Sequence, residues 1–303
     1  MAETEVDFPK RTRELHNALM DSNRWDEFKF RDDDIVIDTW AKSGTTWTQQ
    51  IVSQLVFQGE EGLPVMDIAP WVDMRCFPLD EVLEHVEAQT HRRFMKSHLP
   101  ADALLMSPKA KYLFLARDGR DVAWSFYNHL RSHTDEFYEL VNNTPGLVGP
   151  PIERPGDDVR EFFHGWVEHD GFFDWSYFDH IQSWWDIRDA PNVLLVHFND
   201  LKEDMPGNIR RIAEFLEIDI DEERWPDIVE HCTFDYMKKN ADDISPQLGS
   251  FFADGMTNFV FKGTNQRWRD VLTAEEVENY ENIANSRQTP DCARWHATGE
   301  MPD

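Results

Sequence analysis

The 303-residue sequence has few cysteines, no long apolar run and no convincing cluster of metal-ligating residues. Its three cysteines, Cys76, Cys232 and Cys292, lie far apart, so we expect reduced thiols and a cytoplasmic protein rather than a disulfide framework. No apolar stretch approaches the length of a membrane span, and the charged N-terminus lacks the apolar core of a signal peptide. These absences predict a soluble protein.

Positive charge is also scarce. Lysine and arginine together number 30 against 58 aspartates and glutamates, which gives a formal net charge of -28. So acidic a surface repels nucleic acid and anionic membranes, and we expect neither as a partner. It suits high solubility or a high-salt habitat, and any anion-binding site has to be assembled locally.

The sequence contains no internal repeat and no low-complexity linker. Its most loop-like stretch, residues 142–158, is rich in proline and glycine. This stretch is compatible with a domain boundary, but similar strand and helix patterns occur both before and after it. We therefore predict one domain over residues 1–303, with residues 142–158 as a long surface loop.

Short apolar runs alternate with helix-like segments along the chain. Strands are expected at 35–39, 93–97, 112–116 and 193–198, and helices at 45–58, 80–88, 120–132, 160–167, 178–186, 208–216 and 274–286. Thr273 and Glu276 predict a capping box at the start of the last helix. The alternation predicts an α/β domain with a central, mainly parallel sheet flanked by helices, and ligands at the carboxyl ends of the strands.

The stretch AKSGTTW, residues 41–47, forms a tight turn between a predicted strand and a predicted helix. A helix N-terminus offers unpaired N–H groups and partial positive charge, and Gly44 permits close approach of an anion. Thr45 and Thr46 add hydroxyl groups. In a P-loop the lysine follows the last glycine, whereas Lys42 precedes it. The pattern predicts a P-loop-like phosphate site, and the alternative is an ordinary helix start with a solvated lysine.

Lys96 and His98 flank Ser97 at the end of the next predicted strand. Residues two apart on an extended chain face the same side, so we expect the ammonium and imidazole groups to share one cleft. Histidine suits the role of general base for a hydroxyl nucleophile, and lysine suits the stabilisation of an anionic transition state. For this segment alone, a purely structural histidine is the alternative.

Two further segments carry basic residues that suit an anion. Arg117 follows the buried run YLFLA, where a ligand of the sheet is expected, and Ser125 lies in the first half of the next helix. Near the C-terminus, residues 261–273 form a basic island in an acidic chain. The alternatives are an arginine paired with a neighbouring aspartate and an ordinary surface turn.

Taken in order, these four segments resemble those of the cytosolic-type sulfotransferases. Family members carry a Pro-Lys-Ser-Gly-Thr-Thr-Trp loop, a Lys-Thr-His strand end, an Arg…Ser segment and an Arg-Lys-Gly loop near the C-terminus. Their counterparts here are residues 41–47, 96–98, 117–125 and 261–263, and the resemblance extends from about residue 30 to 287. It implies an enzyme that transfers the sulfuryl group of 3'-phosphoadenosine 5'-phosphosulfate (PAPS) to an acceptor hydroxyl or amine, without a metal ion.

The resemblance also implies roles for individual residues. His98 is the expected general base, and Lys42, Lys96 and Ser125 complete the expected catalytic set. The residues expected to bind PAPS are Lys42, Ser43, Gly44, Thr45, Thr46 and Trp47 around the 5'-phosphosulfate, Arg117, Ser125, Lys262 and Gly263 around the 3'-phosphate, and Thr233 and Phe234 beside the adenine.

Several positions depart from the family pattern. Ala41 stands where the phosphate loop of the family has a proline. Phe261 replaces an arginine expected at the 3'-phosphate, and Arg267 and Arg269 are the candidates to compensate for it. Polar residues that the family carries near the adenine are replaced by Phe198 and Cys232.

The expected partner is a small hydrophobic acceptor such as a phenol or another aromatic or lipid alcohol. Candidates to line its pocket are the aromatic residues Trp71, Phe77, Phe126, Phe137, Phe172, Phe173 and Trp175. A polar glycan, on whose sugar rings the same aromatic residues would stack, stays open as the alternative. The family's dimer motif is matched only loosely by residues 269–278, so a homodimer stays open. A PAPS-dependent dehydratase, a nucleotide-dependent kinase and a nucleotide-binding module without catalysis are the alternative functions.

Overall fold

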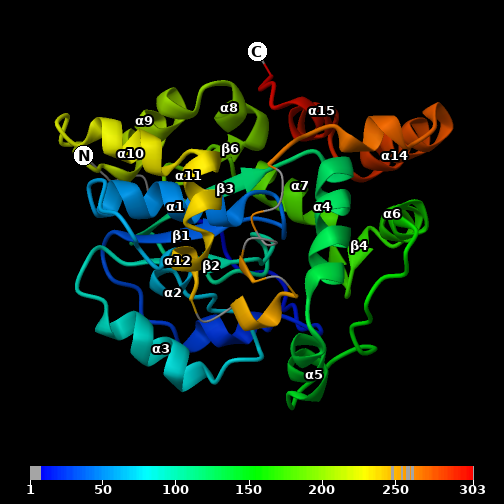
Figure 1. Cartoon of the computed structure of the whole chain (residues 1–303), viewed down its shortest axis with the longest axis horizontal. Coiled ribbons are helices and arrows are strands. Elements are labelled where there is room, and N and C mark those ends of the chain that lie inside the picture. Colours follow the sequence, from blue (N-terminus) through cyan, green and yellow to red (C-terminus); the bar gives the residue numbers. More distant parts are fainter. Residues whose placement is uncertain (1–7, 247–248, 254, 257–259, 261–262, 303) are drawn as a thin grey trace.

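The computed structural model describes residues 8–246, 249–253, 255–256, 260 and 263–302, and Figure 1 shows them as an α/β domain. Its centre is a four-stranded sheet in the order β2-β1-β3-β6, with every neighbouring pair parallel. The strands are β1 (Asp34–Asp38), β2 (Phe94–Ser97), β3 (Ala110–Ala116) and β6 (Val193–His197). The predicted parallel sheet is confirmed, and every strand lies where the apolar runs predict it.

Helices connect the strands and cover the sheet. Those that match predicted segments are α1 (Thr45–Val56), α3 (Leu79–Ala88), α4 (Gly119–Ser132), α6 (Val159–Glu168), α7 (Tyr177–Asp186), α9 (Met205–Leu216) and α14 (Ala274–Arg287). Among the described residues, no helix combines the length and the apolar character needed to cross a membrane. The predicted capping box is present at the start of α14.

Most elements that the sequence pattern did not predict are short. They are η1 (Ser22–Glu27), α2 (Val65–Ile68), α5 (Asp135–Asn143), β4 (Gly171–Phe172), β5 (Trp175–Ser176), α8 (Phe198–Glu203), α10 (Trp225–His231), α11 (Phe234–Lys239), α12 (Ala241–Ile244), η2 (Gly249–Phe251), η3 (Arg267–Asp270) and α15 (Pro290–Thr298). Strands β4 and β5 form a separate antiparallel pair. Elements this short carry too few residues to show a clear periodicity.

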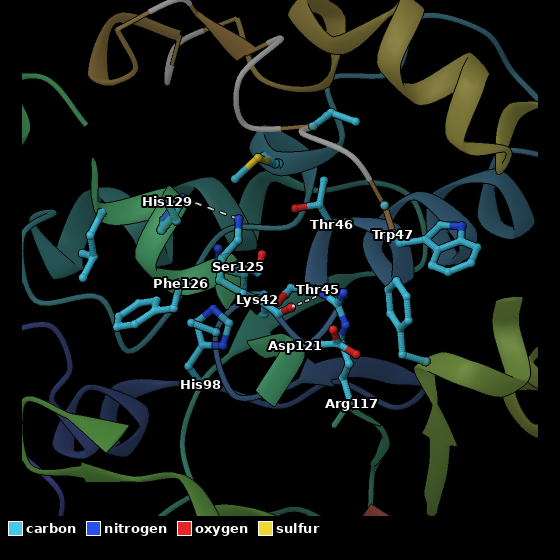
Figure 2. A pocket seen from close by; sticks show the side chains of 18 of the residues that line it. Lys42, Thr45, Thr46, Trp47, His98, Arg117, Asp121, Ser125, Phe126 and His129 are labelled. Atoms are coloured by element: carbon cyan, nitrogen blue, oxygen red, sulfur yellow. Dashed lines mark hydrogen bonds between the residues drawn. The ribbon is translucent and has the colours of Figure 1, made fainter. Parts of the chain in front are cut away.

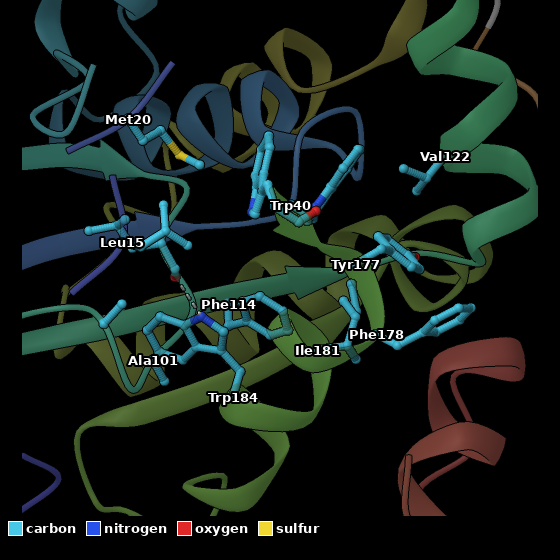
Figure 3. Close-up of a cluster of buried hydrophobic side chains, with 14 of the residues drawn as sticks. Leu15, Met20, Trp40, Ala101, Phe114, Val122, Tyr177, Phe178, Ile181 and Trp184 are labelled. Atoms are coloured by element: carbon cyan, nitrogen blue, oxygen red, sulfur yellow. Dashed lines mark hydrogen bonds between the residues drawn. The ribbon is translucent and has the colours of Figure 1, made fainter. Parts of the chain in front are cut away.

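Alternate side chains of the strands enter two separate cores. Ile35 and Ile37 of β1 pack with residues of α1 and α9 on one face, whereas Val36 packs with residues of α4 and α7 on the other. Figure 3 shows the second core, in which Phe114 of β3 stacks on Trp184 with ring centroids 5.1 Å apart. Both faces are therefore covered, which explains why the strands are apolar throughout instead of alternating.

The strand order places a binding crevice at the carboxyl ends of β1 and β3. From β1 the chain crosses to β2 on one side, and it then returns past β1 to β3 on the other side. The loops that leave β1 and β3 therefore diverge, and open α/β sheets bind ligands at such a switch point. The loop before α1 and the residue Arg117 after β3 lie here.

The proline- and glycine-rich stretch is a long loop that packs against its own domain. Its first residues belong to α5, and the rest extends from residue 144 to 158. The Asn142 side chain accepts from the backbone N–H of Ile152 at 2.7 Å and donates to its carbonyl at 3.0 Å. The Tyr127 hydroxyl of α4 donates to the carbonyl of Gly156. These contacts attach the loop to α5, which precedes it, and to α4.

Candidate active site

The loop between β1 and α1 forms an anion-binding cradle at the carboxyl edge of the sheet. Gly44 has a φ of 124°, and a Cβ atom there would lie 2.6 Å from the Leu115 side chain, so this position requires glycine. No described side chain caps the N-terminus of α1, which leaves its first N–H groups available to a ligand. Thr45 and Thr46 line the same cavity, and the Thr45 hydroxyl lies 2.6 Å from that of Thr39.

Two lysines bring positive charge to the cradle. Burial lowers the pKa of Lys42 to about 7, and the charges of Lys96 and Arg117 contribute. Burial also lowers the pKa of Lys96 to about 8, against the attraction of Asp73. The Lys96 ammonium lies 4.7 Å from the ring centroid of Trp71. An anion bound between the lysines would stabilise their charged forms, so the pair is matched to a ligand of negative charge.

His98 follows β2 and reaches the loop after β1. Its Nδ1 lies 2.5 Å from the carbonyl oxygen of Thr39, and because a carbonyl only accepts, Nδ1 carries the proton. Nε2 is then the basic nitrogen. Burial, with the charges of Lys96 and Lys42, lowers the pKa of His98 well below its usual value, so the ring is neutral at physiological pH. His98 lines the cavity near Lys42, as Figure 2 shows.

Asp73 is a buried carboxylate behind these residues that the sequence analysis missed. Its Oδ2 accepts from the backbone N–H of His98 at 3.2 Å and from the indole of Trp71 at 2.7 Å, and its Oδ1 accepts from Trp25 at 3.1 Å. Burial raises its pKa. Because Trp25 and His98 come from distant parts of the chain, no local pattern marks Asp73 as a residue that contacts His98 and attracts Lys96.

Arg117 stands at the carboxyl end of β3 and joins the β1 loop to the C-terminal segment. Its guanidinium donates to Asn265 Oδ1 at 2.8 and 3.1 Å and to the carbonyl oxygens of Thr264 at 3.1 Å and Lys42 at 3.3 Å. It also lies 4.3 Å from the ring centroid of Phe198. The basic C-terminal segment is thereby held against the phosphate cradle, although the two are far apart in the sequence.

A wall of aromatic rings continues the cavity beyond the cradle. The indole of Trp47 donates to the carbonyl of Cys232 at 2.8 Å, and its ring lies edge-on to Phe198. Gly263 has a φ of 59°, and a Cβ atom there would lie 2.6 Å from the Phe234 ring, so glycine is required here too. The predicted nucleotide-binding residues on this wall that line the cavity are Trp47, Thr233, Phe234 and Gly263.

The cavity has a volume of about 470 Å³ and extends from the cradle into an apolar chamber. Five of the predicted aromatic residues line it: Trp71, Phe77, Phe126, Phe137 and Trp175. Phe172 and Phe173 are not among the lining residues and pack instead near Phe162 and Phe126. The other apolar lining residues include Leu19, Met74, Leu130, Leu140, Ile152, Phe251 and Phe252.

One face of α4 supplies a line of polar side chains to the cavity. Asp121, Ser125 and His129 of this helix, and His133 directly after its end, recur every four residues, and all four line the cavity. Figure 2 shows Asp121, Ser125 and His129 projecting from this helix toward the cradle. The sequence analysis singled out only Ser125. The spacing of four residues over three turns was the available signal for the two histidines.

The remaining predicted site residues differ in their placement. Ser43 is fully buried and is not among the cavity-lining residues. Lys262 and Phe261 fall outside the described residues. Of the two candidate replacement arginines, Arg267 lines the cavity, whereas Arg269 is exposed. Within the described part of the chain, no group of three or more His, Cys, Asp or Glu side chains is arranged to hold a metal ion.

Comparisons with known sequences agree with this chemistry. A family model described as "Sulfotransferase domain" matches residues 32–291. The glycolipid sulfotransferase of Mycobacterium tuberculosis is 30% identical over 316 residues, which cover 96% of each chain. Human sulfotransferase 1E1 is 28% identical, with 92% of this chain and 93% of that protein covered.

Comparisons with solved structures give a similar result. Mouse sulfotransferase SULT7A1, solved with PAP (the desulfated nucleotide), has a TM-score of 0.68 at 22% identity, with 90% of each chain covered. A retinol dehydratase solved with androsterone and the inactive cofactor PAP has a TM-score of 0.67 at 25% identity, with 88% of this chain and 84% of that chain covered. The fold described above is therefore shared with proteins that hold this nucleotide.

Proposed function

The chain belongs to the sulfotransferase domain family, and we propose that it transfers the sulfuryl group of PAPS to a hydroxyl or amine of a small, largely apolar acceptor. The observation that carries this proposal is that one cavity contains both a cationic and an apolar region. A phosphate cradle, two lysines and a neutral histidine stand at one end of it, and an apolar chamber opens beside them. A cavity of this kind brings an anionic donor and an apolar acceptor together.

His98 is the proposed general base. With Nδ1–H held by the carbonyl of Thr39, Nε2 is free to accept the proton of the acceptor hydroxyl. A bond then forms between the acceptor oxygen and sulfur while the bond between sulfur and the bridging oxygen of the donor breaks. The products are the sulfated acceptor and PAP, and the proton remains on His98. Its lowered pKa keeps the base neutral before the reaction.

Lys42 and Lys96 are proposed to stabilise negative charge in the transition state. Sulfuryl transfer resembles phosphoryl transfer, in which catalysis rests on positioning and electrostatic stabilisation. Both ammonium groups line the cavity beside the N-terminus of α1. Ser125, one helical turn before His129 on α4, is proposed to contribute a hydroxyl both to the catalytic set and to the 3'-phosphate site.

The nucleotide is proposed to lie along the aromatic wall. Trp47, Thr233 and Phe234 would contact the adenine, and Gly44, Thr45 and Thr46 the 5'-phosphosulfate. Arg117, with the segment that carries Gly263 and Arg267, would hold the 3'-phosphate. Lys262, expected in the same segment, is part of this proposal from its sequence position alone. Ser43 would act through its backbone, because its side chain is buried away from the cavity.

The acceptor is proposed to be a hydrophobic alcohol or phenol. The chamber beyond His98 is lined by Phe77, Phe126 and Phe137 together with aliphatic side chains. Burying such a ligand removes apolar surface from water, which provides most of its binding free energy. The glycolipid sulfotransferase of Mycobacterium tuberculosis, whose name indicates a lipid-linked acceptor, is consistent with this class.

Titration calorimetry with PAP and with ADP is the test of the donor assignment. We expect tighter binding of PAP, because the proposed site has basic groups for a 5'-phosphate and for a 3'-phosphate, whereas ADP carries its phosphates at one end. Turnover with PAPS and a phenol panel should persist in EDTA. Preference for ADP, or loss of turnover in EDTA, would favour a kinase and overturn the proposal.

A PAPS-dependent dehydratase is the second candidate function. Its support is the likeness to retinol dehydratase, a structure solved with an alcohol and PAP. In that reaction the sulfated alcohol would eliminate sulfate and leave an alkene. Mass spectrometry of the products separates the two functions, since a stable sulfate ester identifies the transferase and a dehydrated hydrocarbon identifies the dehydratase.

A further inference from the structure

Lys42 is linked by a series of contacts to His129 of α4 and to His133, which directly follows this helix. Its Nζ lies 3.4 Å from Nδ1 of His129, and Nε2 of His129 lies 3.3 Å from Nε2 of His133. The Nδ1 of His133 lies 3.1 Å from the carbonyl oxygen of Phe251. Figure 2 marks the contact between Lys42 and His129 with a dashed line. We refer to His129 and His133 together as the histidine pair.

The contact between His133 and Phe251 determines which atom donates and which accepts in the other two hydrogen bonds. The carbonyl of Phe251 only accepts, so Nδ1 of His133 carries a proton and its Nε2 is an acceptor. Nε2 of His129 must then donate to it, which leaves Nδ1 of His129 unprotonated. That nitrogen is therefore an acceptor for the ammonium of Lys42. With both rings neutral, this set of tautomers gives each of these contacts one donor and one acceptor.

The surroundings of the histidine pair keep both rings neutral and in place. Burial and the charge of Lys42 lower the pKa of His129 well below its usual value, and burial lowers that of His133 to about 3. The His133 ring stacks on Phe137 with centroids 3.5 Å apart and planes 8° apart. The backbone of the same segment pairs with Phe252. The pair is thus anchored to a segment well outside the phosphate cradle.

We propose that His129, backed by His133, is a positioning residue that accepts a hydrogen bond from the Lys42 ammonium and keeps this lysine charged and oriented toward the donor. An acceptor is needed because Lys42 faces other cationic groups and has lost much of its hydration. The titratable and charged groups around Lys42 are Lys96, His98, Arg117, Asp121, His129 and His133. The inference rests on the proposed function in assigning Lys42 to the donor.

Three substitutions separate this role from simple packing. His129→Phe keeps a ring and removes the acceptor. His129→Asn places an amide oxygen near the position of Nδ1 and should restore the acceptor. His133→Phe leaves His129 intact but removes its partner, so that Nδ1 of His129 is no longer held unprotonated. His164→Phe, at an exposed histidine of α6 far from the cradle, is the matched control.

The measurement is the pH dependence of kcat/KM for PAPS, which reports the free enzyme. Without the acceptor, the charged form of Lys42 is less stable, so its pKa falls. We expect the alkaline limb to move to lower pH by about one unit in His129→Phe, which is about a tenfold change in the protonation constant of Lys42. His133→Phe should shift it in the same direction, and His129→Asn and His164→Phe should resemble the wild type.

Affinity for PAP, measured by calorimetry at low and high pH, gives a second readout that needs no turnover. The expected loss in His129→Phe is confined to high pH, where its Lys42 is neutral. Superimposable pH profiles for wild type, His129→Phe and His133→Phe would overturn the proposal, as would an Asn variant that behaves like the Phe variant. If His129→Phe fails to fold, the other two variants test the proposal: it requires a shifted pH profile for His133→Phe and a profile like that of the wild type for His129→Asn. A wild type that prefers ADP would instead contradict the proposed function.

Discussion

The two ends of the cavity are built in different ways. The end proposed to bind the donor consists mainly of loops that leave β1, β2 and β3 at the same edge of the sheet, so its residues are placed by backbone pairing. The acceptor end gathers side chains such as Leu19, Phe77, Phe137 and Ile152 from segments that share no strand. Backbone geometry thus fixes the site of the chemistry, whereas side-chain shape fixes what is admitted to it.

Substitution of His98 should give the largest effect, because we expect it to lower turnover while leaving donor binding nearly unchanged. We expect His98→Ala to lower kcat by about 10²- to 10⁴-fold, because general base catalysis typically contributes that much. The affinity for PAP should stay within a factor of about two, since His98 holds no part of the nucleotide; a factor of two corresponds to well under 1 kcal/mol. Steady-state kinetics and calorimetry check the two halves of this prediction. Normal turnover in the variant would exclude His98 as the base.

The pH dependence of donor binding should reflect the two lysines. Lys42 has a pKa of about 7 and Lys96 of about 8, so both are charged at pH 6 and both are largely neutral at pH 9. Affinity for PAP is therefore expected to fall as pH rises through this range, by about tenfold or more for the pair. Calorimetry at each pH measures it, and binding near pH 8 should take up protons from the buffer. The affinity for a neutral aliphatic alcohol, which should bind the acceptor end, is expected not to change with pH. An equal pH dependence for PAP and the alcohol would contradict the proposed difference between the two ends.

The two arginines of η3 offer a matched comparison within the donor end. Arg267 lines the cavity and Arg269 lies exposed beside Trp268. If Arg267 compensates for Phe261, Arg267→Ala should weaken PAP binding by about fivefold, the size of a partly exposed charge interaction near 1 kcal/mol. Binding of adenosine 5'-phosphate, which has no 3'-phosphate, should not change. Arg269→Ala is the control, and unaltered PAP affinity in both variants would show that neither arginine compensates.

The smallest effect is expected at the mouth of the acceptor end. Phe77 lines the cavity but is 37% exposed, so its contribution to binding is partial. Phe77→Ala should raise KM for a hydrophobic phenol by about threefold through lost apolar contact, with KM for PAPS unchanged. A panel of phenols of increasing size measures the effect. A change in KM for PAPS of the same size would mean that the two ends are not independent.

Much of the donor end could be predicted from the sequence because its signals are local. A strand, a tight turn with Gly44 and a helix start occupy consecutive residues, and Lys96 near the end of β2 is only two residues from His98, which directly follows this strand. The four strands were predictable for the same reason. The orientation of the Ser43 side chain was not, because it depends on the turn geometry, in which Lys42 has a φ of 66°.

The parts that escaped prediction depend on contacts between distant segments. Asp73 is recognisable only when Trp25, Trp71 and His98 are brought to it. The link from Lys42 to the histidine pair needs both α4 and the carbonyl of Phe251, although the spacing of four residues along α4 was visible. Of the seven aromatic residues predicted to line the acceptor pocket, five line the cavity, whereas Phe172 and Phe173 pack elsewhere.

The cationic cradle belongs to a chain with a formal net charge of -28. A polyanionic donor is therefore repelled at long range and attracted only once it enters the cavity. Dissolved salt screens distant charges, with a Debye length of about 10 Å at 0.1 M, but affects buried pairs much less. Moderate ionic strength should accordingly speed the association of donor with enzyme, as rapid mixing at increasing salt would measure. An enzyme that attracts anions through a basic surface shows the opposite dependence.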